Sequence, residues 1–180
     1  PFYDRELLTR AAKESGFCEE MIQNHDERPT NSFLYNLVMD TYSFGYNSAA
    51  MVDMPISQKV FLAQFDAIRK IADEGPCVIV GRCADYILKD NENVIKVFIW
   101  APHQSCVETV MDMFSISEKD ADKKIRKIDK HRSEYYRYYT CREWDNARNY
   151  DLCLNSSDLG FDGCVEAIKA YIDVLKNVKK

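Results

Sequence analysis

Hydrophobic side chains recur with a helical period over residues 57–73 of the chain. The stripe returns every three or four positions, as the core-facing side of a helix requires. Its members are Val60, Phe61, Gln64, Phe65, Ile68 and Ile71. Gly75 and Pro76 follow the stripe, and both residue types are typical of a helix end. We therefore predict one long helix over residues 57–73.

Three short apolar runs, which have no helical period, predict β-strands at residues 77–80, 94–101 and 150–155. The first run is uninterrupted (C-V-I-V), which is typical of a strand that is buried on both faces of a parallel sheet. Phe2 and Tyr3 resemble the end of a further strand. In parallel sheets ligands bind at the carboxyl ends of the strands, so the residues that follow each run are candidates for a site.

Helices are predicted between the strands. The first covers residues 4–14, where Asp4 can act as the N-cap and the inward side chains are Leu7, Leu8, Ala11 and Ala12. The last covers residues 161–175, with Val165, Ile168, Ile172 and Leu175 inward. Other helices are predicted within residues 18–30, at 31–38, from the segment after Asp85 to Leu88, and from Pro102 to about Phe114. Residues 40–54 suit either a hairpin or a substrate-facing excursion. The alternation of strands and helices predicts one α/β domain over residues 1–180, with helices flanking a parallel sheet.

One predicted helix, at residues 122–139, is strongly basic (D-K-K-I-R-K-I-D-K-H-R-S-E-Y-Y-R-Y-Y). Ser117 and Asp120 resemble a capping box before it. Ile125 and Ile128 are expected to point inward together, and Asp129 and Arg132 to share a second face. Its other cations are Arg126, Lys127, Lys130, His131 and Arg137. Two interpretations are open: a solvated charged helix, or a phosphate-binding helix, because a guanidinium group fits two phosphate oxygens at once.

Composition narrows the classes of function. The 180 residues carry a net charge of −5, which argues against a general nucleic-acid binder. No apolar run has the length of a membrane span. The seven cysteines are scattered without a C-x-x-C pair, as in a reduced, cytoplasmic protein. The three histidines are far apart, so the spacing predicts no metal site.

A candidate phosphate site follows from the predicted strand ends and the basic helix. Its members are Arg10, Arg82, Arg126, Asp129 and Arg132. Arginine is the residue that best recognises phosphate oxygens, and strand ends place such side chains at one edge of a sheet. The alternatives are structural: Arg82 could pair with Asp85, Asp129 with Arg132 on the surface, and the tyrosines at 135–139 could pack the helix.

Four segments carry a resemblance to a known family. They are F-Y-D-R-E-L-L at residues 2–8, V-I-V-G-R at 78–82, I-D-K-H-R at 128–132 and N-Y-D-L-C-L-N at 149–155. Together they resemble the cytidylate kinase-like family, a branch of the nucleoside monophosphate kinases with a P-loop fold. The resemblance extends over nearly all of the 180 residues. It implies a three-layer α/β fold with a helical lid at residues 115–149.

The resemblance also implies an activity, which is transfer of the ATP γ-phosphoryl group to CMP or dCMP with Mg²⁺. It assigns Arg10 and Arg82 to the substrate phosphate. It assigns Asp129 to the cytosine or ribose and Arg132 to phosphate. Arg126 and Arg132 are the catalytic candidates that follow. ATP and a nucleoside monophosphate are the expected partners, with no nucleic acid and no membrane.

Two features depart from the family. Cys83 follows Arg82 where cytidylate kinases usually carry Asp. The six glycines form no glycine-rich phosphate loop. We expect that loop to precede Pro1 in the full protein, within about 25–30 further residues that form a strand, the loop and a helix. A non-catalytic nucleotide-binding or regulatory module of the same fold is the alternative, and an RNA-binding module that uses the Arg/Tyr-rich helix is a third class.

Overall fold

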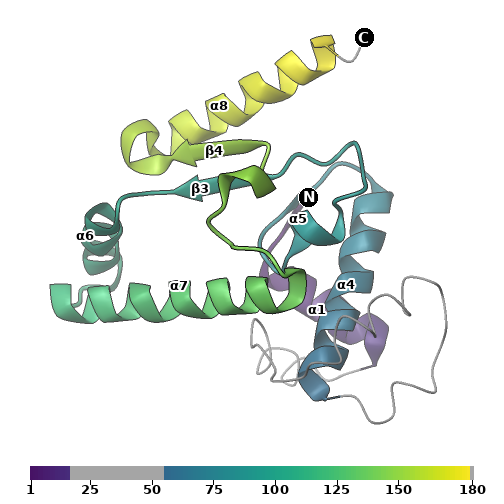
Figure 1. Ribbon diagram of the computed structural model, residues 1–180, viewed down its shortest axis with the longest axis horizontal. Coiled ribbons are helices and arrows are strands. Elements are labelled where there is room, and N and C mark those ends of the chain that lie inside the picture. The colour runs from purple at the N-terminus through teal and green to yellow at the C-terminus, as the bar shows by residue number, and fades with distance from the viewer. Residues whose placement is uncertain (17–54, 179–180) are drawn as a thin grey trace. The chain divides into compact units, whose positions relative to one another are not determined.

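The computed structural model describes residues 1–16 and 55–178 (Figure 1). These residues belong to two compact units. The first unit comprises Pro1–Glu92 and His131–Trp144, and the second comprises Asn93–Lys130 and Asp145–Lys180. The helices predicted within residues 18–30 and at 31–38, and the excursion predicted at 40–54, lie outside the described residues.

The first unit contains two short parallel strands. β1 (Phe2–Tyr3) pairs with β2 (Val78–Ile79), with Phe2 opposite Val78 and Tyr3 opposite Ile79. The amide of Val80 also donates to the carbonyl of Tyr3 at 3.0 Å. Because the pairing is parallel, the residues that follow β1 and β2 lie at the same edge.

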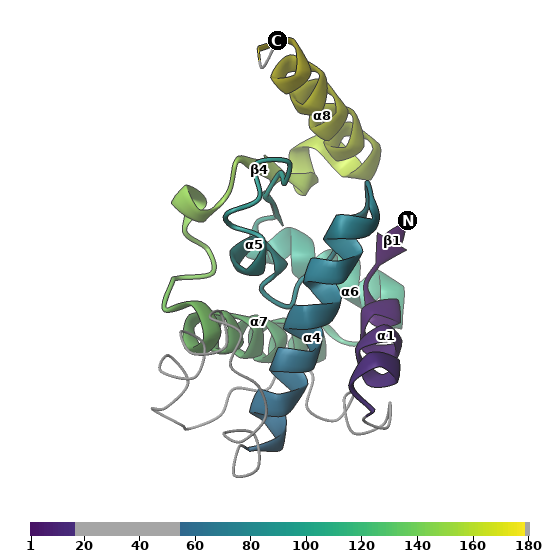
Figure 2. The same ribbon diagram turned by 90° about the vertical axis from the view of Figure 1, so that its right-hand side faces the viewer.

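Two long helices pack together beside these strands. α1 (Arg5–Ser15) follows β1, α4 (Ile56–Glu74) leads into β2, and the two helices pack against each other (Figure 2). The interface is apolar and buried, and its members are Leu7, Ala11, Val60, Ala67, Ile68 and Ile71. Each of its leucine, valine and isoleucine side chains contributes about 1.5–3 kcal/mol through burial. The whole stripe predicted over residues 57–73 is buried, so this prediction is confirmed.

A second, aromatic core joins α4 to the end of α7 (Glu118–Thr140) within the first unit. Its buried members are Phe61, Phe65, Cys83, Tyr135, Tyr136 and Tyr139. The rings of Phe61 and Tyr139 stack with centroids 3.9 Å apart. The hydroxyl of Tyr135 donates to Oε1 of Gln64 at 3.3 Å, which explains why a polar residue lies in an apolar stripe. The tyrosines pack this helix, which confirms the structural interpretation of residues 135–139.

The second unit has its own pair of parallel strands. β3 (Val97–Trp100) pairs with β4 (Leu152–Asn155), and Val97 lies opposite Leu152. A short 3₁₀ helix, η2 (Ala147–Asn149), precedes β4, and α8 (Ser156–Val178) follows it and packs on the strands (Figure 1). Gly160 interrupts α8 with a φ of 66°, a left-handed conformation that glycine adopts without strain.

The helices α6 (His103–Phe114) and the first half of α7 complete the second unit. Val107 of α6 packs against Ala121 and Ile125 of α7, and all three are buried. The amide of Asp120 donates to Oγ of Ser117 at 3.2 Å, and that hydroxyl donates to the carboxylate of Asp120 at 2.6 Å. Ser117 therefore caps the basic helix as predicted, but the Asp120 carboxylate bonds to the Ser117 hydroxyl rather than to the backbone amide that a full capping box uses.

The sheet differs from the prediction in its extent. The α/β class and the parallel strands are confirmed, but the four strands of the described residues form two two-stranded sheets rather than one. The run at residues 77–80 was predicted to be buried on both faces, yet Val78 is 57% exposed. A two-stranded sheet leaves its faces and edges less covered than a wide one. The prediction of a single domain stays a prediction.

Two helical side chains also differ from the prediction. Ile128 is 39% exposed, although it was predicted to point inward with Ile125. Three residues turn a helix by about 300°, so Ile128 lies about 60° away from the side on which Ile125 meets Val107. Val165 is 52% exposed, and in its part of α8 the buried side chain is the neighbouring Cys164. No helix of the described ranges, residues 1–16 and 55–178, is long and apolar enough to cross a bilayer.

Candidate functional site

An ion pair joins the two strand ends of the first unit. Asp4 follows β1, and Arg82 lies shortly after β2. Nη1 of Arg82 donates to Oδ1 of Asp4 at 3.0 Å and to the carbonyl of Val80 at 3.1 Å. The Arg82 side chain is only 6% exposed, whereas that of Asp4 is 47% exposed. A buried guanidinium needs such partners, because a charge is costly to remove from water without them.

The backbone around Arg82 is in an unusual conformation. Gly81, Arg82 and Cys83 have φ angles of 73°, 51° and 56°. Glycine adopts this region freely, but each of the other two residues costs about 1–2 kcal/mol there. We call residues 81–83 the left-handed turn. Such strain persists only where the surroundings hold it, and it is frequent at functional sites.

Side chains on both sides of the left-handed turn hold it in place. Cys83 is 3% exposed and packs in the aromatic core. Asp85, two residues later on α5 (Ala84–Ile87), accepts a hydrogen bond from the hydroxyl of Tyr136 at 2.6 Å. Burial raises the pKa of Asp85, and the bond from Tyr136 and the charge of Arg142 partly oppose this increase. Asp85 therefore bonds to Tyr136 rather than to Arg82, and the carboxylate partner of Arg82 is Asp4.

Arg10 has a different partner. It lies on α1, and its Nη1 donates to Oε2 of Glu74 at 2.7 Å, while its Nη2 bonds to Oε1 of the same carboxylate. This two-pronged contact links α1 to the last residue of α4. Bidentate pairing is the strong geometry for arginine and a carboxylate, and a phosphate can offer the same pair of oxygens.

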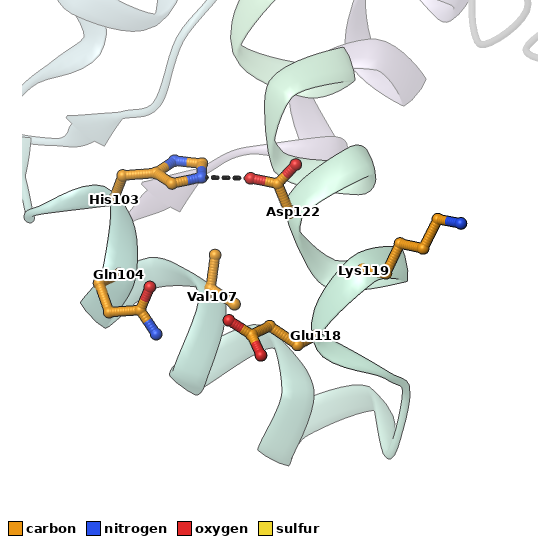
Figure 3. Close-up of a pocket in the computed structure, with 6 residues that line it drawn as sticks. All are labelled: His103, Gln104, Val107, Glu118, Lys119 and Asp122. Atoms are coloured by element: carbon orange, nitrogen blue, oxygen red, sulfur yellow. Dashed lines mark hydrogen bonds and ion pairs between the residues drawn. The ribbon is translucent and has the colours of Figure 1, made fainter.

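The second unit contains a small pocket of about 290 Å³. It is lined by His103, Gln104, Val107, Glu118, Lys119 and Asp122 (Figure 3). Nε2 of His103 lies 2.6 Å from Oδ1 of Asp122, and Nε of Arg126 donates to both oxygens of Asp122 at 3.0 Å. Arg126, followed by His103, lowers the pKa of Asp122, and Asp122 raises the pKa of Arg126. The predicted residue Arg126 thus neutralises a carboxylate at the wall of this pocket.

The remaining predicted residues lie on exposed positions of α7. Asp129 lies in the second unit. The pKa of the Cys106 thiol on α6 is raised mainly by burial of that thiol, and the negative charge of Asp129 is the second cause. Arg132 lies in the part of α7 that belongs to the first unit. The five predicted residues are thus divided, with Arg10, Arg82 and Arg132 in the first unit and Arg126 and Asp129 in the second. Their assignment to one phosphate site stays a prediction.

Sequence reasoning did not find the partners of these residues. The sequence predicts a helix cap at Asp4, whereas Asp4 forms an ion pair with Arg82. The contact between His103 and Asp122 has no counterpart among the predictions. Glu74 and Asp122 are not among the predicted partners, and Tyr136 is predicted only to pack the helix. The parallel pairing of β1 and β2 was the signal for Asp4, since it places residues 4 and 82 at one edge. The other partners leave no local sequence signal.

The structure also limits the sites for a metal. In residues 1–16 and 55–178, no group of three or more His, Cys, Asp or Glu side chains is placed to hold an ion. Mg²⁺ in phosphoryl-transfer enzymes is commonly bound through substrate phosphates, waters and one or two carboxylates. The described residues therefore do not form a metal-binding cage of their own.

Comparisons with known proteins extend these observations. Residues 1–158 match the sequence model of the cytidylate kinase-like family. Among solved structures, the chain is similar to the crystal structure of an uncharacterized protein from Eubacterium ventriosum ATCC 27560, with 37% sequence identity and a TM-score of 0.62. That similarity covers 64% of this chain and 73% of the other. A comparison with curated proteins finds no match.

Proposed function

Since the chain belongs to the cytidylate kinase-like family, we propose that it acts as a nucleoside monophosphate kinase. The reaction transfers the γ-phosphoryl group of ATP to the phosphate of a nucleoside monophosphate, which forms the diphosphate and ADP. CMP or dCMP is the acceptor that we propose, and cytoplasm is the proposed location. Catalysis of this kind depends on positioning and on neutralising negative charge.

The observation that carries the proposal is the buried Arg82 on the left-handed turn. The guanidinium of Arg82 is only 6% exposed. Arg82 and its neighbour Cys83 both have strained φ angles, and they lie at the ends of parallel strands. The guanidinium is therefore preorganised to bind an anion. Its partner Asp4 is 47% exposed on its side chain and therefore accessible to solvent. A phosphate group can replace that carboxylate and keep the guanidinium paired.

The same exchange applies to Arg10. In the structure, Glu74 bonds to its guanidinium through two oxygens. A phosphate dianion offers the same geometry with more charge, so we propose that Arg10 also binds the substrate phosphate. Paired carboxylates keep both arginines oriented before the nucleotide arrives, which reduces the entropy lost on binding.

The basic helix has further roles in the proposal. We assign Arg126 and Arg132 of α7 to neutralising charge on the transferred phosphoryl group and Asp129 to the base or ribose. ATP and Mg²⁺ follow from the family, and Mg²⁺ supplies charge neutralisation on the ATP phosphates. Because the described residues form no metal-binding group, we assign none of them to holding the ion.

A nucleotide-binding or regulatory module without turnover is the second candidate, and Cys83 favours it. The side chain of Cys83 is buried in the aromatic core. A thiol has no carboxylate, so Cys83 cannot take the role of the Asp that cytidylate kinases usually carry after this arginine. Such a module would be stabilised by nucleotides against heat without converting them.

Product formation by the full-length protein tests the first candidate. The protein is incubated with ATP, Mg²⁺ and, separately, CMP, dCMP, UMP, AMP and GMP, and the nucleoside diphosphates are separated by chromatography. We expect turnover with the cytidine nucleotides. Arg82→Ala should lower kcat/KM by roughly 10- to 100-fold, as expected for one charged hydrogen-bonding group.

Arg148→Ala is the matched control, because Arg148 is an exposed arginine of η2 that the proposal does not use. Equal kcat/KM values for the two variants would remove Arg82 from the site. If no monophosphate is converted, the kinase assignment is wrong. Thermal stabilisation by a nucleotide in that case would leave the binding module as the function.

A further inference from the structure

A hydrogen bond joins α7 to α5, the helix that directly follows the left-handed turn. The hydroxyl of Tyr136 donates to Oδ2 of Asp85 at 2.6 Å, across 51 positions of sequence. Asp85 lies three residues after Arg82, in the first turn of α5. Tyr136 lies one helical turn after Arg132 on α7, and both belong to the first unit. The bond thus connects the segments that carry two of the arginines assigned to phosphate.

The surroundings make this bond a firm one. The Tyr136 side chain is buried in the aromatic core, where Cys83 of the left-handed turn also packs. Arg142 lies over the ring of Tyr86, the neighbour of Asp85, with its guanidinium carbon 5.2 Å from the ring centre. A hydrogen bond between a phenol and a carboxylate in low-dielectric surroundings is both strong and directional. Tyr136 can therefore fix the position of the chain around residues 82–85.

We propose that Asp85 and Tyr136 form a positioning pair, which holds the left-handed turn so that Arg82 is aligned for the phosphate of the nucleotide. Neither residue needs to touch the nucleotide. The left-handed φ angles of Arg82 and Cys83 are unfavourable, so without an anchor the turn can relax and move the guanidinium. A displacement of about 1 Å is enough to weaken the alignment of a reacting group. This inference rests on the proposed kinase function.

The proposal predicts a specific effect of acidity. The groups that act on Asp85 are the hydroxyl of Tyr136 on α7, the backbone of Tyr86 and of Asp85 itself on α5, and the charge of Arg142. The hydrogen bond from Tyr136 lowers the pKa of Asp85 against the larger effect of burial. Protonation of Asp85 weakens this bond in the unsubstituted protein, so Asp85 contributes to the fall of kcat/KM at acidic pH. Tyr136→Phe has no such bond to weaken and should lose that part of the acidic fall.

Steady-state kinetics of the full-length protein test the pair. Tyr136→Phe keeps the ring and removes the hydroxyl. Tyr138→Phe is the matched control, because it makes the same change two residues away, where the tyrosine hydroxyl meets Gln58. We expect Tyr136→Phe to raise KM for the monophosphate by roughly 10- to 100-fold, with KM for ATP close to that of the control. The melting temperature should fall as well, because the largely buried carboxylate of Asp85 loses its hydrogen-bond donor. Asp85→Asn, whose amide oxygen still accepts the bond, should raise KM less than Asp85→Ala.

The experiment distinguishes failure of the positioning pair from failure of the kinase assignment. If the unsubstituted protein converts a monophosphate but Tyr136→Phe and Tyr138→Phe have equal KM values and equal pH profiles, the positioning pair is wrong and the kinase assignment stands. If the unsubstituted protein converts no monophosphate, the kinase assignment fails, and the positioning pair fails with it.

Discussion

Replacing Asp4 by Asn tests whether Arg82 is held ready for an anion. The substitution keeps the size of the side chain but removes the charge that faces the buried guanidinium. Breaking a fully buried pair typically costs about 3–5 kcal/mol. Asp4 is 47% exposed, so solvent screening reduces the loss, and we expect the free energy of unfolding to fall by about 1–3 kcal/mol. For a chain of this size that corresponds to roughly 2–12 °C in melting temperature.

The informative result is the response to phosphate. If an anion replaces Asp4 at Arg82, inorganic phosphate or CMP should raise the melting temperature of Asp4→Asn more than that of the unsubstituted protein. In the variant the anion no longer competes with a carboxylate, and it restores a partner to a buried charge. Thermal denaturation at increasing phosphate concentration measures both shifts, with sulfate and chloride at equal ionic strength separating anion binding from screening.

Asp73→Asn is the matched control, because Asp73 is an exposed residue near the end of α4. It should change the melting temperature by no more than about 1–2 °C. Its response to phosphate should equal that of the unsubstituted protein. Equal phosphate shifts in Asp4→Asn, Asp73→Asn and the unsubstituted protein would refute the reasoning, because Arg82 would then not be the group that receives the anion.

Two further predictions concern each unit by itself. Phe61→Ala should lower the free energy of unfolding by about 3–5 kcal/mol in denaturant titrations, because it empties the centre of the aromatic core; a loss below about 1 kcal/mol would contradict that packing. In the second unit, Arg126 and His103 hold the pKa of Asp122 below its ordinary value of 3.8. The stability that the Asp122 carboxylate adds should be present above that value and lost as the pH falls through the lowered pKa. Urea titrations of the unsubstituted protein and Asp122→Asn across this range measure it, and a constant difference would contradict it.

Local patterns in the sequence were sufficient to predict the helices. The stripe from Val60 to Ile71 appears as one buried face, because a helix repeats its environment every few residues. Ser117 caps the basic helix through a residue only three positions away. Both features depend on contacts between near neighbours, which the order of residues determines directly.

The ion pairs could not be predicted in the same way. Arg82 and Asp4 are separated by 78 positions, and Arg10 and Glu74 by 64. Their meeting depends on the register of β1 and β2 and on the packing of α1 against α4. The sequence offers several candidate carboxylates for each arginine, and for Arg82 one of them is Asp85. In the structure Asp85 bonds to Tyr136 instead. Only tertiary structure decides between them.

The exposure of the strands also could not be predicted from the sequence. An apolar run such as residues 77–80 indicates a strand, but not how many strands lie beside it or what covers its faces. Gln64 illustrates the opposite case. It is a polar residue at a core position, and the hydroxyl that satisfies it belongs to Tyr135, 71 positions away.

Because Cys83 is buried, the reactivity of its thiol can report on movements of the left-handed turn. A thiol reagent reaches a buried cysteine only when the chain around it opens, so the labelling rate of Cys83 measures the opening equilibrium of that segment. Cys141 and Cys153 are exposed and should react at once, which provides an internal reference in the same sample. Mass spectrometry of the labelled peptides would then follow a local fluctuation at single-residue resolution, under native conditions and without any catalytic assay.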